Sequence, residues 1–78
     1  MEFDFSRLKG RIAEKFETRA AFAAHVGLKP SALSNRLRGV TPFRAEEIML
    51  ICQPDCLGID SKEIGEYFFT PKVLLLEQ

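Results

Sequence analysis

The segment from Thr18 to Gly39, TRAAFAAHVGLKPSALSNRLRG, constrains the fold more than any other part of the chain. Its apolar residues and its central Gly27 fall where two short helices joined by a tight turn require them, which predicts a helix-turn-helix. Ala23 falls where the second helix crosses the first, so a small side chain is needed there. Gly27 supplies the left-handed backbone conformation that lets a helix end abruptly. The inward-facing positions of the unit are Phe22, Ala23, Val26, Leu28 and Leu33.

The second helix of this unit, expected to begin at Pro30, has an apolar side and a polar side. At about 100° per residue, Leu33 and Leu37 lie about 40° apart, and the polar residues gather within about 100° on the other side. Serine and asparagine form hydrogen bonds with base edges, and arginine binds guanine or phosphate. Because such a helix can enter the major groove, the sequence predicts a surface that reads duplex DNA. This acid-free face consists of Ser31, Ser34, Asn35 and Arg38.

The chain has no net charge, but its charges are unevenly distributed. Residues 1–44 hold nine Lys and Arg against four acids, a net charge of +5, whereas residues 45–78 hold two against seven, a net charge of −5. The basic half contains the helix-turn-helix. This asymmetry indicates an anionic partner on one side of the molecule only.

Length and composition predict one domain over residues 1–78. Of the 78 residues 46% are apolar, but no stretch of about 18 uninterrupted apolar residues could span a bilayer. The N-terminus lacks the pattern of a secretory signal, so we expect a cytoplasmic protein. A core of this size is marginal, and contacts with a second subunit would add to it.

The sequence shows no catalytic constellation, phosphate-binding glycine loop or small-molecule site, so we expect neither an enzyme nor a cofactor. Cys52, Cys56 and His25 are the only candidates for a zinc site, and a structural zinc site needs four ligands in paired spacing. We therefore expect no metal and two core thiols. His25 ends the first helix of the motif. A cation there interacts favourably with the helix dipole, or it contacts a phosphate.

Apolar spacing predicts three further helices around the motif. The first covers about residues 5–16 and is capped by Asp4 or Ser6. The fourth follows a cap at Thr41 and ends before Pro54, and the fifth follows a capping box at Asp60 and ends before Pro71. The result is an all-α, compact five-helix bundle with a short extended C-terminal tail, residues 70–78.

Three stretches, FDFSRLKGRIAEKF, AFAAHVGL with LSNRLRG, and EIGEYFFTPKV, resemble the lambda-repressor-like class of DNA-binding domains, in particular small Cro-type regulators of phages and prophages. The resemblance covers essentially the whole chain. It implies a lambda-repressor-like five-helix bundle that binds an operator in a bacterial host as a dimer and represses transcription by occluding a promoter.

The resemblance also implies roles for individual residues. Arg19 corresponds to a phosphate-clamping residue, Lys29 and Ser31 lie where base and backbone contacts begin, and Thr41 to Arg44 correspond to a contact with the far backbone. A usually apolar position holds Arg36 instead, and we expect its side chain to flank the groove. The predicted DNA-binding set is Arg19, Lys29, Ser31, Ser34, Asn35, Arg36, Arg38, Thr41 and Arg44.

Two alternatives remain open from the sequence. The same scaffold could serve as a protein-interaction module, antitoxin-like or anti-repressor, that docks through its acidic half and apolar tail. The tail segment Val73 to Leu76 either packs on its own core or pairs with a second subunit. We favour a homodimer, because two-fold operators require paired recognition helices.

Overall fold

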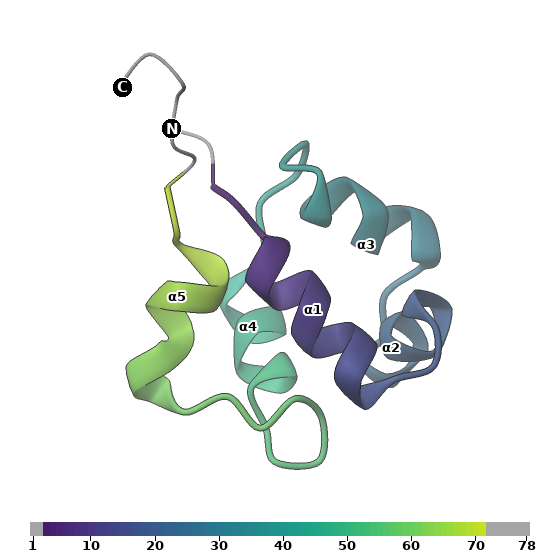
Figure 1. Cartoon of the computed structure of the whole chain (residues 1–78). Helices are drawn as coiled ribbons and strands as arrows, with labels where there is room; N and C mark the ends of the chain where they lie inside the picture. The colour runs from purple at the N-terminus through teal and green to yellow at the C-terminus, as the bar shows by residue number, and fades with distance from the viewer. Residues whose placement is uncertain (1–2, 72–78) are drawn as a thin grey trace.

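The structure, a computed structural model, describes residues 3–71, which form an all-α bundle. In Figure 1, α1 crosses the front of the bundle, with α5 on one side and α2 and α3 on the other, and it contacts both α2 and α5. The elements in chain order are α1 (Ser6–Lys15), α2 (Arg19–His25), α3 (Pro30–Leu37), α4 (Ala45–Ile51), the 3-10 turn η1 (Ser61–Glu63) and α5 (Ile64–Phe68). The expected five-helix bundle is confirmed for these residues.

The helix-turn-helix predicted from Thr18 to Gly39 is present as α2, a turn and α3. The Thr18 hydroxyl accepts a hydrogen bond from the Ala21 N–H at 3.0 Å and so caps α2. Gly27 has a φ of +79°, and the next N–H, of Leu28, donates to the Ala23 carbonyl at 2.8 Å. These contacts end α2 abruptly, so the chain turns and α3 crosses α2. Ala23 is fully buried, which agrees with the need for a small side chain there.

Among residues 3–71, one apolar core lies between the helices. A chain of edge-to-face aromatic contacts joins Phe5, Phe43 and Phe68, with centroids 5.4 and 5.3 Å apart, so the loop before α4 is fastened to α1 and α5. The largest fully buried side chains are Phe22, Phe68, Leu8, Ile12, Leu33, Ile51 and Leu57.

The fourth helix begins later than the sequence predicts. Thr41 does not cap it, because Arg44 occupies the N-cap position and Thr41 lies three residues before it. The N–H groups of Val40 and Thr41 both donate to the Asn35 carbonyl, at 2.9 and 3.3 Å, and close the end of α3. The helix starts at Ala45, where the Glu47 carboxylate accepts a hydrogen bond from the Arg44 N–H at 2.9 Å. The prediction of Thr41 as a cap is therefore wrong.

Both ends of the described chain leave the bundle together. Phe3 and Pro71 form an antiparallel bridge, and the Asp4 N–H donates to the Thr70 carbonyl at 2.7 Å. At the start of α1, Asp4 also accepts a hydrogen bond from the Ser6 N–H at 2.8 Å, although Phe5, and not the predicted Asp4 or Ser6, occupies the N-cap position. Most of the predicted tail, residues 72–78, lies outside the described residues. Among residues 3–71, no helix has the length and apolar character needed to cross a membrane.

Candidate nucleic-acid interface

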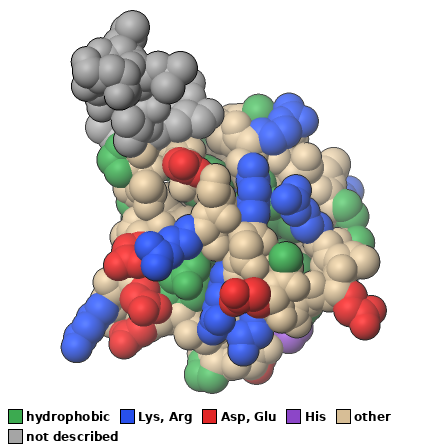
Figure 2. All heavy atoms as spheres, viewed as in Figure 1, with side chains coloured by type: hydrophobic (Ala, Val, Ile, Leu, Met, Phe, Trp, Pro, Cys, Tyr) green, Lys and Arg blue, Asp and Glu red, His purple; other side chains and the backbone are tan. Residues whose placement is uncertain are grey.

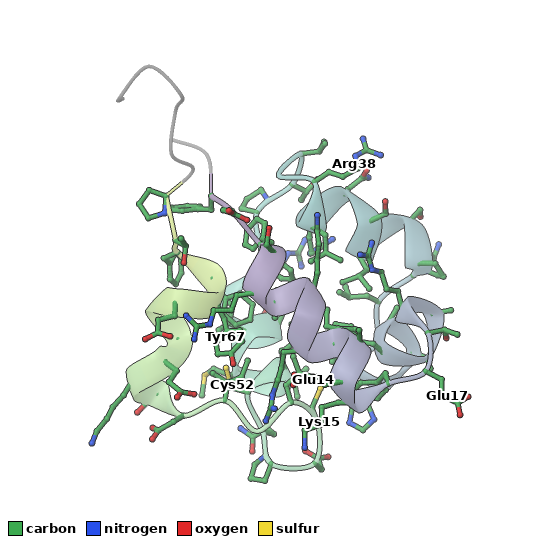
Figure 3. The ribbon with its side chains drawn as sticks, viewed as in Figure 1. Glu14, Lys15, Glu17, Arg38, Cys52 and Tyr67 are labelled. Atoms are coloured by element: carbon green, nitrogen blue, oxygen red, sulfur yellow. The ribbon has the colours of Figure 1, made fainter. Side chains whose placement is uncertain are left out.

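The polar side of α3 faces outward, as the helical spacing predicts. Ser31, Ser34 and Arg38 are exposed, and Asn35 is half-buried. Arg38, at the end of α3, points away from the bundle (Figure 3). The opposite side of the helix carries Leu33 and Leu37, which are buried in the core. We call the outward strip formed by Ser31, Ser34, Asn35 and Arg38 the polar face of α3.

Basic side chains border the polar face of α3. In Figure 2, Lys and Arg gather at the upper right, over α1 and α3, whereas at the lower left, over α5, acidic side chains are mixed with Lys and Arg. Arg19 begins α2, Lys29 precedes α3, and Arg44 precedes α4; all three are exposed, while Thr41 is half-buried. Within residues 3–71, neither Arg19, Lys29 nor Arg38 forms an ion pair. These cations therefore remain available to an anionic ligand.

Arg36 does not belong to this exposed set. Its side chain is only 9% exposed, and its guanidinium forms a two-pronged ion pair with Glu47: Nε donates to Oε1 at 2.7 Å and Nη2 donates to Oε2 at 2.9 Å. Nη1 donates to the Ala32 carbonyl at 3.2 Å. The prediction that Arg36 flanks the groove is therefore wrong, because the carboxylate at the start of α4 holds the guanidinium inside the fold.

The helical spacing explains why Arg36 turns inward. At about 100° per residue it lies about 60° from Leu33, closer to the apolar stripe than to the centre of the polar face. Its charge is tolerated there because it is paired and hydrogen-bonded. The polar face therefore consists of short side chains and Arg38, without a second arginine.

Glu47 connects α3 to the start of α4, and sequence reasoning missed this role. Its Oε1 accepts hydrogen bonds from both the Arg36 side chain and the Arg44 backbone N–H. Burial alone would raise the pKa of Glu47, but the hydrogen bonds from Arg36 and Arg44 and their positive charges outweigh burial, so the pKa is lowered. The available sequence signal was an acid three residues after Arg44, the spacing at which a side chain reaches back to cap a helix.

The cysteines and His25 lie away from the polar face of α3. Cys56 is buried and Cys52 half-buried, and neither forms a disulfide. Burial raises the pKa of Cys56 to about 11 and raises that of Cys52, so both thiols stay protonated at neutral pH. This confirms the expected core thiols. His25 contacts the Phe16 ring and lies 3.7 Å from an Asp55 oxygen. In the part of the chain described, no group of His, Cys, Asp and Glu could hold a metal ion.

The fold and this surface define a helical bundle with a helix-turn-helix whose second helix presents an acid-free polar face. The chain belongs to the family described as protein of unknown function (DUF739), which matches residues 1–71. Among curated proteins, none matched the chain. Because the family description carries no activity, the Cro-type function stays a prediction.

The Glu47 contacts predict a specific acid sensitivity. A carboxylate with a lowered pKa in the folded state stabilises the protein fully above its ordinary pKa of 4.5, and this contribution is lost as the pH falls through the folded-state value. Glu47→Gln leaves Arg36 buried without a charged partner, so it should lower the unfolding free energy by about 3–5 kcal/mol at pH 7.

Urea unfolding from pH 7 to pH 3 measures this effect. The difference between wild type and Glu47→Gln should shrink toward pH 3, whereas Glu46→Gln, at the exposed neighbouring position, should change stability by less than about 1 kcal/mol. A stability loss in Glu47→Gln that does not vary with pH would contradict the assignment.

Proposed function

We propose that the chain is a sequence-specific transcription regulator of the Cro or repressor type that places α3 in the major groove of duplex DNA. The observation that carries the proposal is the outward, acid-free polar face of α3. The other side of this helix is buried in the core through Leu33 and Leu37. Short hydroxyl and amide side chains suit hydrogen bonds to base edges, and Arg38 suits guanine or a phosphate. The site of action would be the cytoplasm of a bacterial cell.

The exposed cations around this face support the same function. Arg19, Lys29 and Arg44 lie at the starts of α2, α3 and α4, where their positive charges favour phosphate. At the start of α3, whose first turn contains no acid, the helix N–H groups favour phosphate as well. Phosphate contacts give affinity and register, while α3 selects the sequence. Bound at an operator that overlaps a promoter, the protein would exclude RNA polymerase.

The proposal includes a second copy of the chain as partner on DNA. A two-fold operator presents half-sites about one helical turn, roughly 34 Å, apart, and one α3 can read only one of them. The bound form is therefore a homodimer with two equivalent recognition helices. Binding without sequence preference is a weaker explanation, because the chain has no net positive charge to supply the affinity.

One observation favours the alternative of a protein-interaction module. On α4, Met49 and Leu50 are 65% and 52% exposed, which is unusual for large apolar side chains on adjacent positions. The same surface would also serve contact between two subunits. Binding to duplex DNA that weakens steeply with salt separates a regulator from a module that binds only protein.

Asn35 is the residue of choice for testing base reading. Site selection from random duplex DNA with the purified chain should yield a palindromic operator, and Asn35→Ala should weaken binding to it by about 1–3 kcal/mol while relaxing one position. Binding to scrambled DNA should change little. Gln53→Ala, which removes an exposed amide from the second half of the chain, is the control. Equal losses of affinity for operator and scrambled DNA would show that Asn35 does not read bases.

Arg19 tests the phosphate contacts. Arg19→Ala should weaken binding to operator and scrambled DNA alike, and the slope of log affinity against log salt should become shallower by about one. Lys62→Ala removes an exposed charge from the acidic half and should leave the slope unchanged. An unaltered slope for Arg19→Ala would show that Arg19 contacts no phosphate.

A further inference from the structure

We propose that the buried Arg36–Glu47 pair positions the polar face of α3 and thereby sets sequence discrimination without touching DNA. This inference rests on the function proposed above and deepens it, since it concerns how the same face is held. Both side chains are nearly buried, at 9% and 12% exposed, so neither can contribute a direct base contact in this conformation.

The pair restrains α3 in a way that the apolar core does not. Leu33 and Leu37 pack against the core through contacts that have little directional preference. The planar guanidinium of Arg36, by contrast, is held by two parallel hydrogen bonds to Glu47 and a third to the Ala32 carbonyl. Such a fork tolerates only small changes in angle. It therefore fixes the rotation of α3 about its own axis.

Rotation of this helix matters for base reading. A side-chain tip lies about 5–6 Å from the helix axis, so a rotation of about 20° moves it by about 2 Å. That displacement exceeds what a hydrogen bond to a base edge tolerates. Contacts with phosphates through long cationic side chains survive the same movement, so discrimination is more sensitive to rotation than overall affinity.

Glu47 extends the restraint to the loop between α3 and α4. Its Oε1 holds the Arg44 N–H at 2.9 Å as well as the Arg36 Nε at 2.7 Å. One carboxylate thus sets the position of the polar face relative to Arg44, the proposed contact with the far backbone. Stability alone does not call for this arrangement, because well-packed apolar residues in place of a buried ion pair are often equally stable or more stable.

The test replaces the pair by apolar side chains of similar size, Arg36→Met with Glu47→Leu, in the full chain. The matched control makes the same exchanges at the exposed pair Arg7 and Glu66, whose nearest side-chain N and O atoms are 3.0 Å apart. Both variants keep the net charge unchanged. The buried-pair variant should lose about tenfold or more in the ratio of operator to scrambled-DNA affinity, while its affinity for scrambled DNA stays within about twofold of wild type. The control should keep the ratio.

A second measurement separates this inference from the proposed function. Residual dipolar couplings of backbone amides should show α3 reoriented or averaged in the buried-pair variant, with α1 and α5 unchanged. If the wild-type chain shows no preference for any DNA sequence, the regulator function is overturned. The residual dipolar couplings would still show whether the Arg36–Glu47 pair positions α3. A folded variant with wild-type couplings in α3, or with the full affinity ratio, would overturn the inference. If the double variant does not fold, Arg36→Lys, which keeps the charge but loses the fork, should fold with a reduced ratio; a full ratio there would overturn it as well.

Discussion

The orientation of α3 depends on the ion pair between the Arg36 guanidinium and the Glu47 carboxylate. Leucine packing places the apolar side of the helix on the core and leaves the polar side facing outward. The paired hydrogen bonds of 2.7 and 2.9 Å restrain the rotation of the helix about its own axis. Because the same carboxylate caps α4 through the Arg44 N–H, the end of α3, the following loop and the next helix form one connected unit. This unit fixes the polar face of α3 relative to Arg44.

The chemical character of the polar face depends on the absence of acidic side chains and of Arg36 from it. Arg36 is turned inward and the acidic residues lie mainly in the second half of the chain, so the strip presents hydroxyls, an amide and one guanidinium. Exposed cations stand at the starts of α2, α3 and α4. Among residues 3–71, no acidic partner forms an ion pair with Arg19, Lys29 or Arg38. A neutral chain can in this way offer a local anion-binding surface, which is the physical basis of the proposed DNA contact.

Local patterns in the sequence were sufficient for most of the fold. Thr18, Ala23 and Gly27 each have one local role, a cap, a close crossing and a left-handed turn, and all three were predictable from spacing alone. The ion pair of Arg36 was not, because its partner is a carboxylate eleven residues away that only the folded chain brings near. The helical spacing alone places Arg36 nearer the apolar stripe than the polar face, but it does not identify Glu47. The cap predicted at Thr41 failed for a related reason: the loop after α3 extends to Arg44, which occupies the N-cap position of α4, while the Thr41 N–H helps to close the end of α3. An apolar helix face produces a periodic pattern in the sequence, whereas an ion pair between residues on two sides of a loop does not.

The most direct test of the account is an NMR titration of the isotopically labelled chain with duplex DNA that carries a selected operator. Amide shifts should concentrate in Ser31, Ser34, Asn35 and Arg38 and at the starts of α2 and α4, with α5 unaffected. Shifts confined to α5 and the acidic half, or no shifts at DNA concentrations that saturate sequence-specific regulators, would contradict it.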